Sequence, residues 1–230
     1  MITPTEWFNK NAHEYDTKLS SDLANAENEV LFDYLAQEIN KGDTVFDAGC
    51  GTGLLLDYID IEPLNYLGWD ISEEMVRIAK SKHPEHKFIC RDILEPCSEG
   101  FDVVVSLFGV ISLMDTIEEG VKACLSKSAG KTVLMVNGSR DPYSREDSIY
   151  TLCNDEPVDV KTLELTEWLE ILESCGVKNC LTLPFNLRVD DFAEECLSLD
   201  AYKYILELEL MTPNTAWYKD RVGFYLTTVF

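Results

Sequence analysis

Apolar residues recur along this chain at two spacings, and each spacing predicts one kind of element. Stripes that repeat every three or four residues predict amphipathic helices, and short continuous runs of apolar or β-branched residues predict buried strands. Helical spacing predicts helices over 23–40, 54–59, 116–125, 166–174 and 189–211, and another helix that begins after Ser72. Residues 5–20 have a similar spacing and are expected to form a helix or a loop. Strands are expected over 44–46, 64–69, 87–90, 101–108, 131–136, 177–183 and 222–230.

The segment VFDAGCGTG, residues 45–53, predicts a strand, a glycine turn and a helix in direct succession. Asp47 comes at the carboxyl tip of the strand, and Gly49, Gly51 and Gly53 allow a tight turn. The N-terminus of the following helix offers unpaired N–H groups, so a small polar ligand is expected at this turn.

The spacing of the glycines helps to identify the class of ligand that the turn binds. Dinucleotide sites use GxGxxG, whereas these glycines alternate and follow an acid, which disfavours NAD. The Asp47 carboxylate would repel phosphates and suits a ligand with an ammonium or sulfonium group. A plain glycine-rich turn without a ligand is the alternative.

The segment DAGCGTG resembles the first motif of the class I S-adenosylmethionine (SAM) methyltransferases. The resemblance implies that Asp47 and the turn residues Gly49, Cys50 and Gly51 lie beside the methionine part of the cofactor. It covers residues 44–136, and outside that range it is weak.

An acid also follows the second expected strand, because Asp70 lies 23 residues after Asp47. An acid at that place can accept hydrogen bonds from both ribose hydroxyls, with Ile71 beside it. The alternative role, capping the next helix, is already filled by Ser72.

Two further strand tips match the family. The resemblance implies that Asp92 binds the adenine amino group and that Ile93 packs on the ring. It also implies that the main chain at the end of the fourth strand, Ser106, Leu107 and Phe108, lies against the methionine end. In a doubly wound sheet this tip is the topological switch point, where ligands bind.

The N-terminal segment also resembles the lid of small-molecule methyltransferases, in which a tyrosine corresponding to Tyr15 reaches the cofactor. Simple cover of the sheet is the alternative for this segment. A long loop at 137–162, where the hydrophobic period fails, can overhang the pocket.

The order of elements resembles the seven-stranded methyltransferase fold. We expect one α/β domain over 1–230, with a doubly wound, mostly parallel seven-stranded sheet, helices on both faces and an extra helical insertion before the last strand. We divide it into an N-terminal helical cover or lid (1–40), a cofactor-binding core (44–136) and substrate-side insertions (137–165 and 185–220).

The charge of the chain argues against nucleic acid as a partner. Its 230 residues carry a formal net charge of −23, which repels a phosphate backbone. The tip of the fourth strand also lacks the Asn-Pro-Pro-Tyr signature of enzymes that methylate bases or glutamine.

No run approaches the roughly 20 apolar residues of a membrane span, and the start lacks a signal-peptide pattern.

Eight cysteines occur without a CxxC pair and read as buried thiols in a reducing compartment, so we expect a cytoplasmic protein. The three histidines have no ligand spacing, and no metal is expected.

The resemblance implies an enzyme that transfers the SAM methyl group to a small-molecule acceptor by in-line displacement, leaving S-adenosylhomocysteine (SAH). No catalytic residue is identified. If a general base is needed, His13, Asp141 and Tyr143 are candidates by location only. The alternatives are an aminopropyl-type transferase on the same fold and a non-catalytic SAM-binding regulatory subunit. The chain is expected to act as a monomer or homodimer.

Overall fold

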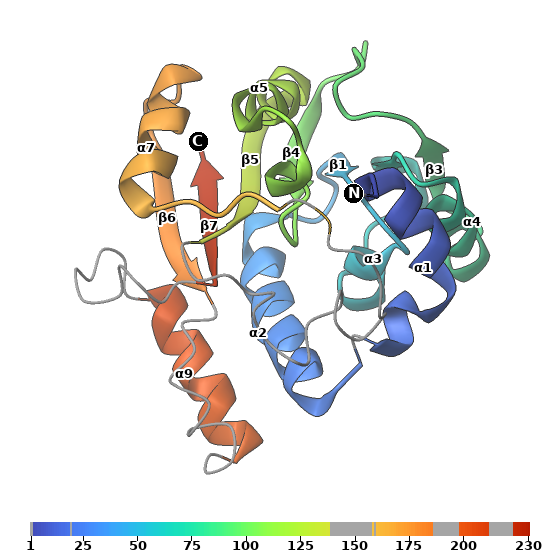
Figure 1. The fold of residues 1–230 in the computed structure, drawn as a ribbon, viewed down its shortest axis with the longest axis horizontal. Coiled ribbons are helices and arrows are strands. Elements are labelled where there is room, and N and C mark those ends of the chain that lie inside the picture. The colour runs from blue at the N-terminus through green and yellow to red at the C-terminus, as the bar shows by residue number, and fades with distance from the viewer. Residues whose placement is uncertain (1, 19, 139–157, 159, 186–197, 212–222) are drawn as a thin grey trace.

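In the computed structural model of this chain, the residues described are 2–18, 20–138, 158, 160–185, 198–211 and 223–230. They form an α/β fold in which one sheet carries helices on both faces (Figure 1).

The sheet has seven strands in the order β3-β2-β1-β4-β5-β7-β6. β7 is antiparallel to both of its neighbours, and the pairings from β3 through to β5 are all parallel. The mostly parallel, doubly wound sheet expected from the sequence is confirmed. The strands are β1 Val45–Ala48, β2 Tyr66–Asp70, β3 Lys87–Cys90, β4 Phe101–Ser106, β5 Ser128–Asn137, β6 Cys180–Phe185 and β7 Phe224–Val229.

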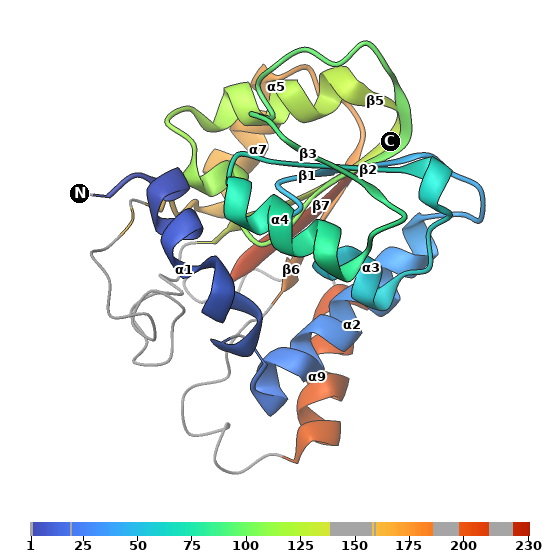
Figure 2. The same cartoon turned by 90° about the vertical axis from the view of Figure 1, so that its right-hand side faces the viewer.

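Helices lie above and below this sheet, as Figure 2 shows in an edge-on view. One face packs on α5 and α7, and the other packs on α2, α3, α4 and α9. The α-helices are α1 Pro4–Lys18, α2 Asp22–Glu38, α3 Leu54–Tyr58, α4 Glu73–Lys82, α5 Ile117–Lys127, α7 Leu165–Ser174 and α9 Leu199–Met211, with 3-10 helices η1 Pro63–Asn65 and η2 Ile111–Leu113.

Alternation of side chains along the strands divides the core into two layers. In β1, Val45 packs with the layer under α2, whereas Phe46 packs with Trp69 and the layer under α5. Both layers are apolar because parallel strands are covered on both faces. The helical insertion predicted before the last strand is present as α9, and it packs against α2 through buried Leu206 and Leu210.

Several predicted boundaries differ from the structure. β2 begins at Tyr66 and not at residue 64, because η1 places the Leu64 side chain in solvent, where it is 99% exposed. β4 ends at Ser106, two residues before the predicted end, because the backbone turns at Phe108, which has a φ of 53°. β5 begins at Ser128, directly after α5.

Among the described residues, none of the helices combines the length and the apolar character that crossing a membrane requires.

Candidate functional site

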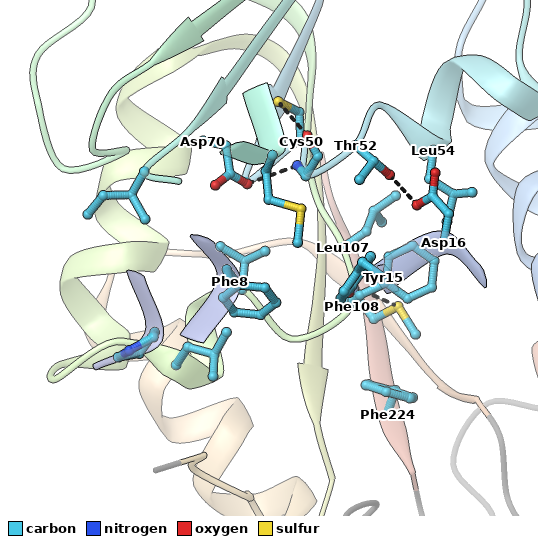
Figure 3. A pocket seen from close by; sticks show the side chains of 18 of the residues that line it. Phe8, Tyr15, Asp16, Cys50, Thr52, Leu54, Asp70, Leu107, Phe108 and Phe224 are labelled. Carbon is cyan, nitrogen blue, oxygen red and sulfur yellow. Dashed lines mark hydrogen bonds between the residues drawn. The ribbon is translucent and has the colours of Figure 1, made fainter. Parts of the chain in front are cut away.

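A cavity of about 1290 Å³ lies at the carboxyl edge of β1, β2 and β4, between the sheet and α1 (Figure 3). Its floor is the turn after β1, its inner wall is the ends of β2 and β4, and its outer wall is α1 and the start of α2. Carboxyl ends of strands at a switch point are where doubly wound sheets bind ligands.

The glycine turn forms the floor and has the left-handed backbone that glycine permits. The N–H groups of Gly49 and Cys50 both donate to the Trp69 carbonyl, at 2.8 and 3.0 Å, which ties the turn to β2. A Cβ atom on Gly49 would come within 2.4 Å of Val110, whereas one on Gly51, where φ is 51°, would meet nothing within 4 Å. The space above Gly51 is therefore open toward the cavity, as a ligand cradle requires.

Asp70 lies at the end of β2 with its carboxylate beside this turn. One oxygen accepts from the Gly51 N–H at 2.8 Å and the other from the Ser72 N–H at 2.8 Å. Burial raises the pKa of Asp70, and those two N–H donors act in the opposite direction. A carboxylate has about four acceptor positions, so after these two bonds Asp70 retains capacity for two hydroxyl donors such as those of a ribose. Ser72 caps α4 by accepting from the Met75 N–H at 3.2 Å, as predicted.

Asp47 is placed differently from Asp70. It is 4% exposed, accepts a hydrogen bond from the Tyr66 hydroxyl at 2.9 Å and lies below the turn, outside the set of lining residues. Burial raises the pKa of Asp47 to about 7, the Tyr66 hydrogen bond lowers it, and the neighbouring Asp70 charge raises it. Asp47 does not line the cavity, so it can act on a ligand there by holding the turn in place and, when it is ionised, by its charge.

The loop after β3 supplies the far end of the cavity. Asp92, Ile93 and Leu94 line it, and Ile71 faces them from the end of β2. Ile71 and Leu94 are large apolar side chains that are 47% and 44% exposed, so both present apolar surface where they line the cavity. The Leu94 N–H donates to Asp92 at 2.9 Å and fixes this loop. A flat heterocycle can pack on these apolar groups with its amino group toward Asp92.

A residue that the sequence analysis did not identify supports this loop from below. Lys127, at the end of α5, is 2% exposed, and its Nζ donates to the Ile93 carbonyl at 2.7 Å and the Ala123 carbonyl at 3.2 Å. The Nζ also lies 5.6 Å from the Trp69 ring centroid. Burial lowers the pKa of Lys127. Its position in the sequence, in a run of polar residues that ends a helix, gives no sign of this burial.

The opposite end of the cavity is lined by aromatic residues. Tyr15, from α1, and Phe108, after β4, both point into it (Figure 3). Tyr15 packs edge-on against Phe8, with the ring centroids 5.9 Å apart. Leu107 also lines the cavity, while the Ser106 side chain is fully buried in the sheet.

Polar contacts hold α1 over the site. Asp16 accepts from the Thr52 hydroxyl of the glycine turn at 2.6 Å and pairs with Lys82 at 3.0 Å. The Asn9 side-chain oxygen accepts from the Ser72 hydroxyl at 2.8 Å and the Glu74 N–H at 3.2 Å. The sequence pattern indicated the helix, but these partners lie 36 to 66 residues away and could not be read from it.

Of the three candidate bases, only His13 belongs to the described part of the chain. His13 lies on the side of α1 that faces α4, where its ring contacts Arg77 at 3.3 Å and Glu74 at 3.7 Å. It is not a lining residue. Asp141 and Tyr143 lie outside the described residues. Within the described part of the chain, no group of three or more His, Cys, Asp or Glu side chains could hold a metal ion.

Comparison with known proteins points to one family. Residues 45–127 match the family model described as a methyltransferase domain. Among curated relatives, an uncharacterised protein of Methanocaldococcus jannaschii is 33% identical over 109 residues, which are 46% of this chain and 40% of that protein. A ubiquinone biosynthesis O-methyltransferase of Coxiella burnetii is 28% identical over 167 residues, 62% of this chain and 68% of that one. The matched part of this chain thus covers less than half of the length of the protein from Methanocaldococcus jannaschii.

The fold is shared with solved methyltransferases. The magnesium protoporphyrin IX methyltransferase of Synechocystis, crystallised with SAH, superposes with a TM-score of 0.61 over 98% of this chain and 96% of its own, at 17% identity. The matched segment, residues 45–127, contains the glycine turn, Asp70, Asp92 and Lys127. Residues 45–127 are thus similar to methyltransferase domains, and the chain has the fold of solved methyltransferases.

Proposed function

We propose that this protein transfers the methyl group of SAM to a small-molecule acceptor. The observation that carries the proposal is the open cradle above Gly51 beside the Asp70 carboxylate, within a cavity large enough for two molecules. Pockets for one small ligand measure roughly 300–1,000 Å³, and this cavity is larger.

The residues fit the parts of SAM in order along the cavity. Asp70 would accept from the ribose hydroxyls, and Asp92 with Ile71 and Ile93 would hold the adenine. The open space above Gly51 would take the methionine part, which brings the sulfonium toward Tyr15 and Phe108. Aromatic faces attract a cation by about 0.5–2 kcal/mol, so these two rings suit that position.

Bound SAM supplies an electrophilic methyl group, which an acceptor lone pair attacks in line as the carbon–sulfur bond breaks and its electron pair stays on sulfur. The acceptor's proton then leaves to water. What this chain contributes is the relative position of the two reactants. Holding two reactants in line can contribute up to roughly 7–11 kcal/mol, so no covalent nucleophile is needed.

A transfer assay tests the proposal. The protein is incubated with SAM carrying a labelled methyl group and with pooled small metabolites, and products are separated by mass. We expect label on a metabolite together with SAH. Methylthioadenosine as the coproduct would contradict methyl transfer, and so would the absence of labelled product at full SAM occupancy in exhaustive acceptor pools.

A further inference from the structure

The cavity continues past the cradle into a chamber lined by aromatic rings, and its occupant can be inferred from the residues there. We propose that this chamber binds the acceptor, and that the acceptor is a flat aromatic molecule without negative charge. The inference rests on the proposed function, because it names the substrate class for the same cavity.

Residues from four strands build the chamber wall. Phe108 follows β4, Met135 belongs to β5, Phe185 ends β6 and Phe224 begins β7. Phe185 and Phe224 are paired neighbours across the β6–β7 ladder. β7 is antiparallel, so its first residue reaches the same edge of the sheet as the last residues of β4 and β6. The topology thus places Phe108, Phe185 and Phe224 at the same edge of the sheet.

Part of the chamber wall is formed by side chains of the buried core. Met135 and Phe185 are 0% and 2% exposed, whereas Phe108 and Phe224 are partly exposed in front of them. The Phe108 N–H contacts the Met135 sulfur at 3.5 Å, and the Phe32 ring lies 6.2 Å from the Phe108 ring. A surface of aromatic faces and sulfur favours aromatic ligands, which it contacts by stacking and edge-on packing.

The chamber lies on the methyl side of the cofactor position. In Figure 3, Phe108 and Tyr15 stand between Asp70 and Phe224. Asp70 and Asp92 define the ribose and adenine end, so an acceptor beyond Phe108 approaches the sulfonium from the opposite side. That placement is the one that an in-line attack requires.

The charges that line the cavity disfavour an anionic acceptor. Seven carboxylates and one ammonium group line it: Asp16, Glu27, Asp57, Asp70, Asp92, Asp115 and Glu119, and Lys18. Glu27, at the α2 side, accepts a hydrogen bond from the Tyr202 hydroxyl at 2.5 Å. A carboxylate or phosphate on the acceptor would be repelled in this partly desolvated space, whereas a neutral or cationic ring would not.

Two probes that differ in one charge test the proposal. Naphthalen-2-ol and 6-hydroxy-2-naphthoate share a ring system and a hydroxyl group. Their dissociation constants are measured by ligand-observed NMR with the protein saturated in SAH, after calorimetry has shown SAH binding. We expect naphthalen-2-ol to bind at least tenfold more tightly than the naphthoate.

Matched variants locate the binding. Phe224→Leu removes a ring from the chamber but remains apolar, so it should weaken naphthalen-2-ol binding severalfold. Phe230→Leu removes a ring at the other end of the same segment, where Phe230 is 63% exposed and lines no part of the cavity, and should change nothing. SAH affinity should be the same in both variants.

The outcomes are distinct. Equal binding of both probes, or an unchanged affinity in Phe224→Leu, would overturn the inference while SAH binding leaves the proposed function intact. Failure of the wild-type protein to bind SAH would overturn the proposed function and this inference with it.

Discussion

Gly51 and Gly42 both have a left-handed backbone, with φ of 51° and 97°, and both face open space where a Cβ would be. Alanine at either position is strained by about 1 kcal/mol. Only Gly51 lies in the cavity. Gly51→Ala should therefore lower SAH affinity at least tenfold in calorimetry, because its methyl group occupies the cradle, whereas Gly42→Ala should leave affinity unchanged. Equal affinities in the two variants would contradict a cofactor cradle at Gly51.

Asp47 makes stability depend on pH. Its pKa is about 7 in the folded protein because of burial, against an ordinary value of 3.8. Between these values the folded state holds a proton that the unfolded chain has released. The contribution of Asp47 to stability is thus greatest below about pH 4, falls as the pH rises toward 7, and is level above that.

The matching variant is Asp47→Asn, which keeps an acceptor for the Tyr66 hydroxyl but does not titrate. The free energy of unfolding of the wild type minus that of Asp47→Asn, from urea denaturation at a series of pH values, should fall by up to roughly 4 kcal/mol between pH 4 and 7. A difference that is independent of pH would show that Asp47 is not buried in this way.

Among the elements, α5 supports through Lys127 the loop after β3 (residues 92–94), which we propose holds the adenine. Lys127→Met should lower the affinity for both SAH and adenosine by the same factor, about fivefold to tenfold, because the Ile93 carbonyl loses its donor. Turnover at saturating SAM should persist, since the proposed place of methyl transfer is the other end of the cavity. Lys122→Met, at an exposed position on the same helix, is the control. Loss of SAH affinity without loss of adenosine affinity would contradict a role at the adenine end.

Helix α1 covers the site, and Asp16 fastens it to the glycine turn and to Lys82. Asp16→Ala should therefore accelerate SAH dissociation severalfold in a stopped-flow displacement experiment. Glu14→Ala, which removes an exposed α1 carboxylate that pairs with Lys18 of the same helix, should not. If both variants release SAH at the wild-type rate, the Asp16 contacts do not retain the cofactor.

Over the whole molecule, the sequence predicted the sheet and the local geometry of the turn after β1 well, because both follow from patterns within a few consecutive residues. A glycine turn, an acid at a strand tip and a serine cap are each set by a few consecutive residues, as Gly51, Asp70 and Ser72 show. The order of strand and helix patterns then indicated the doubly wound topology. Strand ends were less predictable, since Leu64 is apolar and yet lies in solvent.

The rest of the site depends on contacts between distant segments. Phe224 meets Phe185 only because β7 runs antiparallel, and Lys127 meets Ile93 only through the packing of α5 on the sheet. Neither hydrophobic periodicity nor a sequence motif indicates contacts between segments so far apart in the sequence. They were found only in the folded arrangement, and so was the contact of His13 with Arg77 of α4.

The proposed activity requires that the cavity beside Asp70 binds SAM, and calorimetric titration of the protein with SAM measures this binding. We predict one-to-one binding that weakens about 10- to 100-fold in Asp70→Asn, which loses charge-assisted acceptance of the ribose hydroxyls, and is unaltered in Asp60→Asn, an exposed control. No binding of SAM by the folded wild type, or an affinity in Asp70→Asn equal to that of the wild type, would contradict the account.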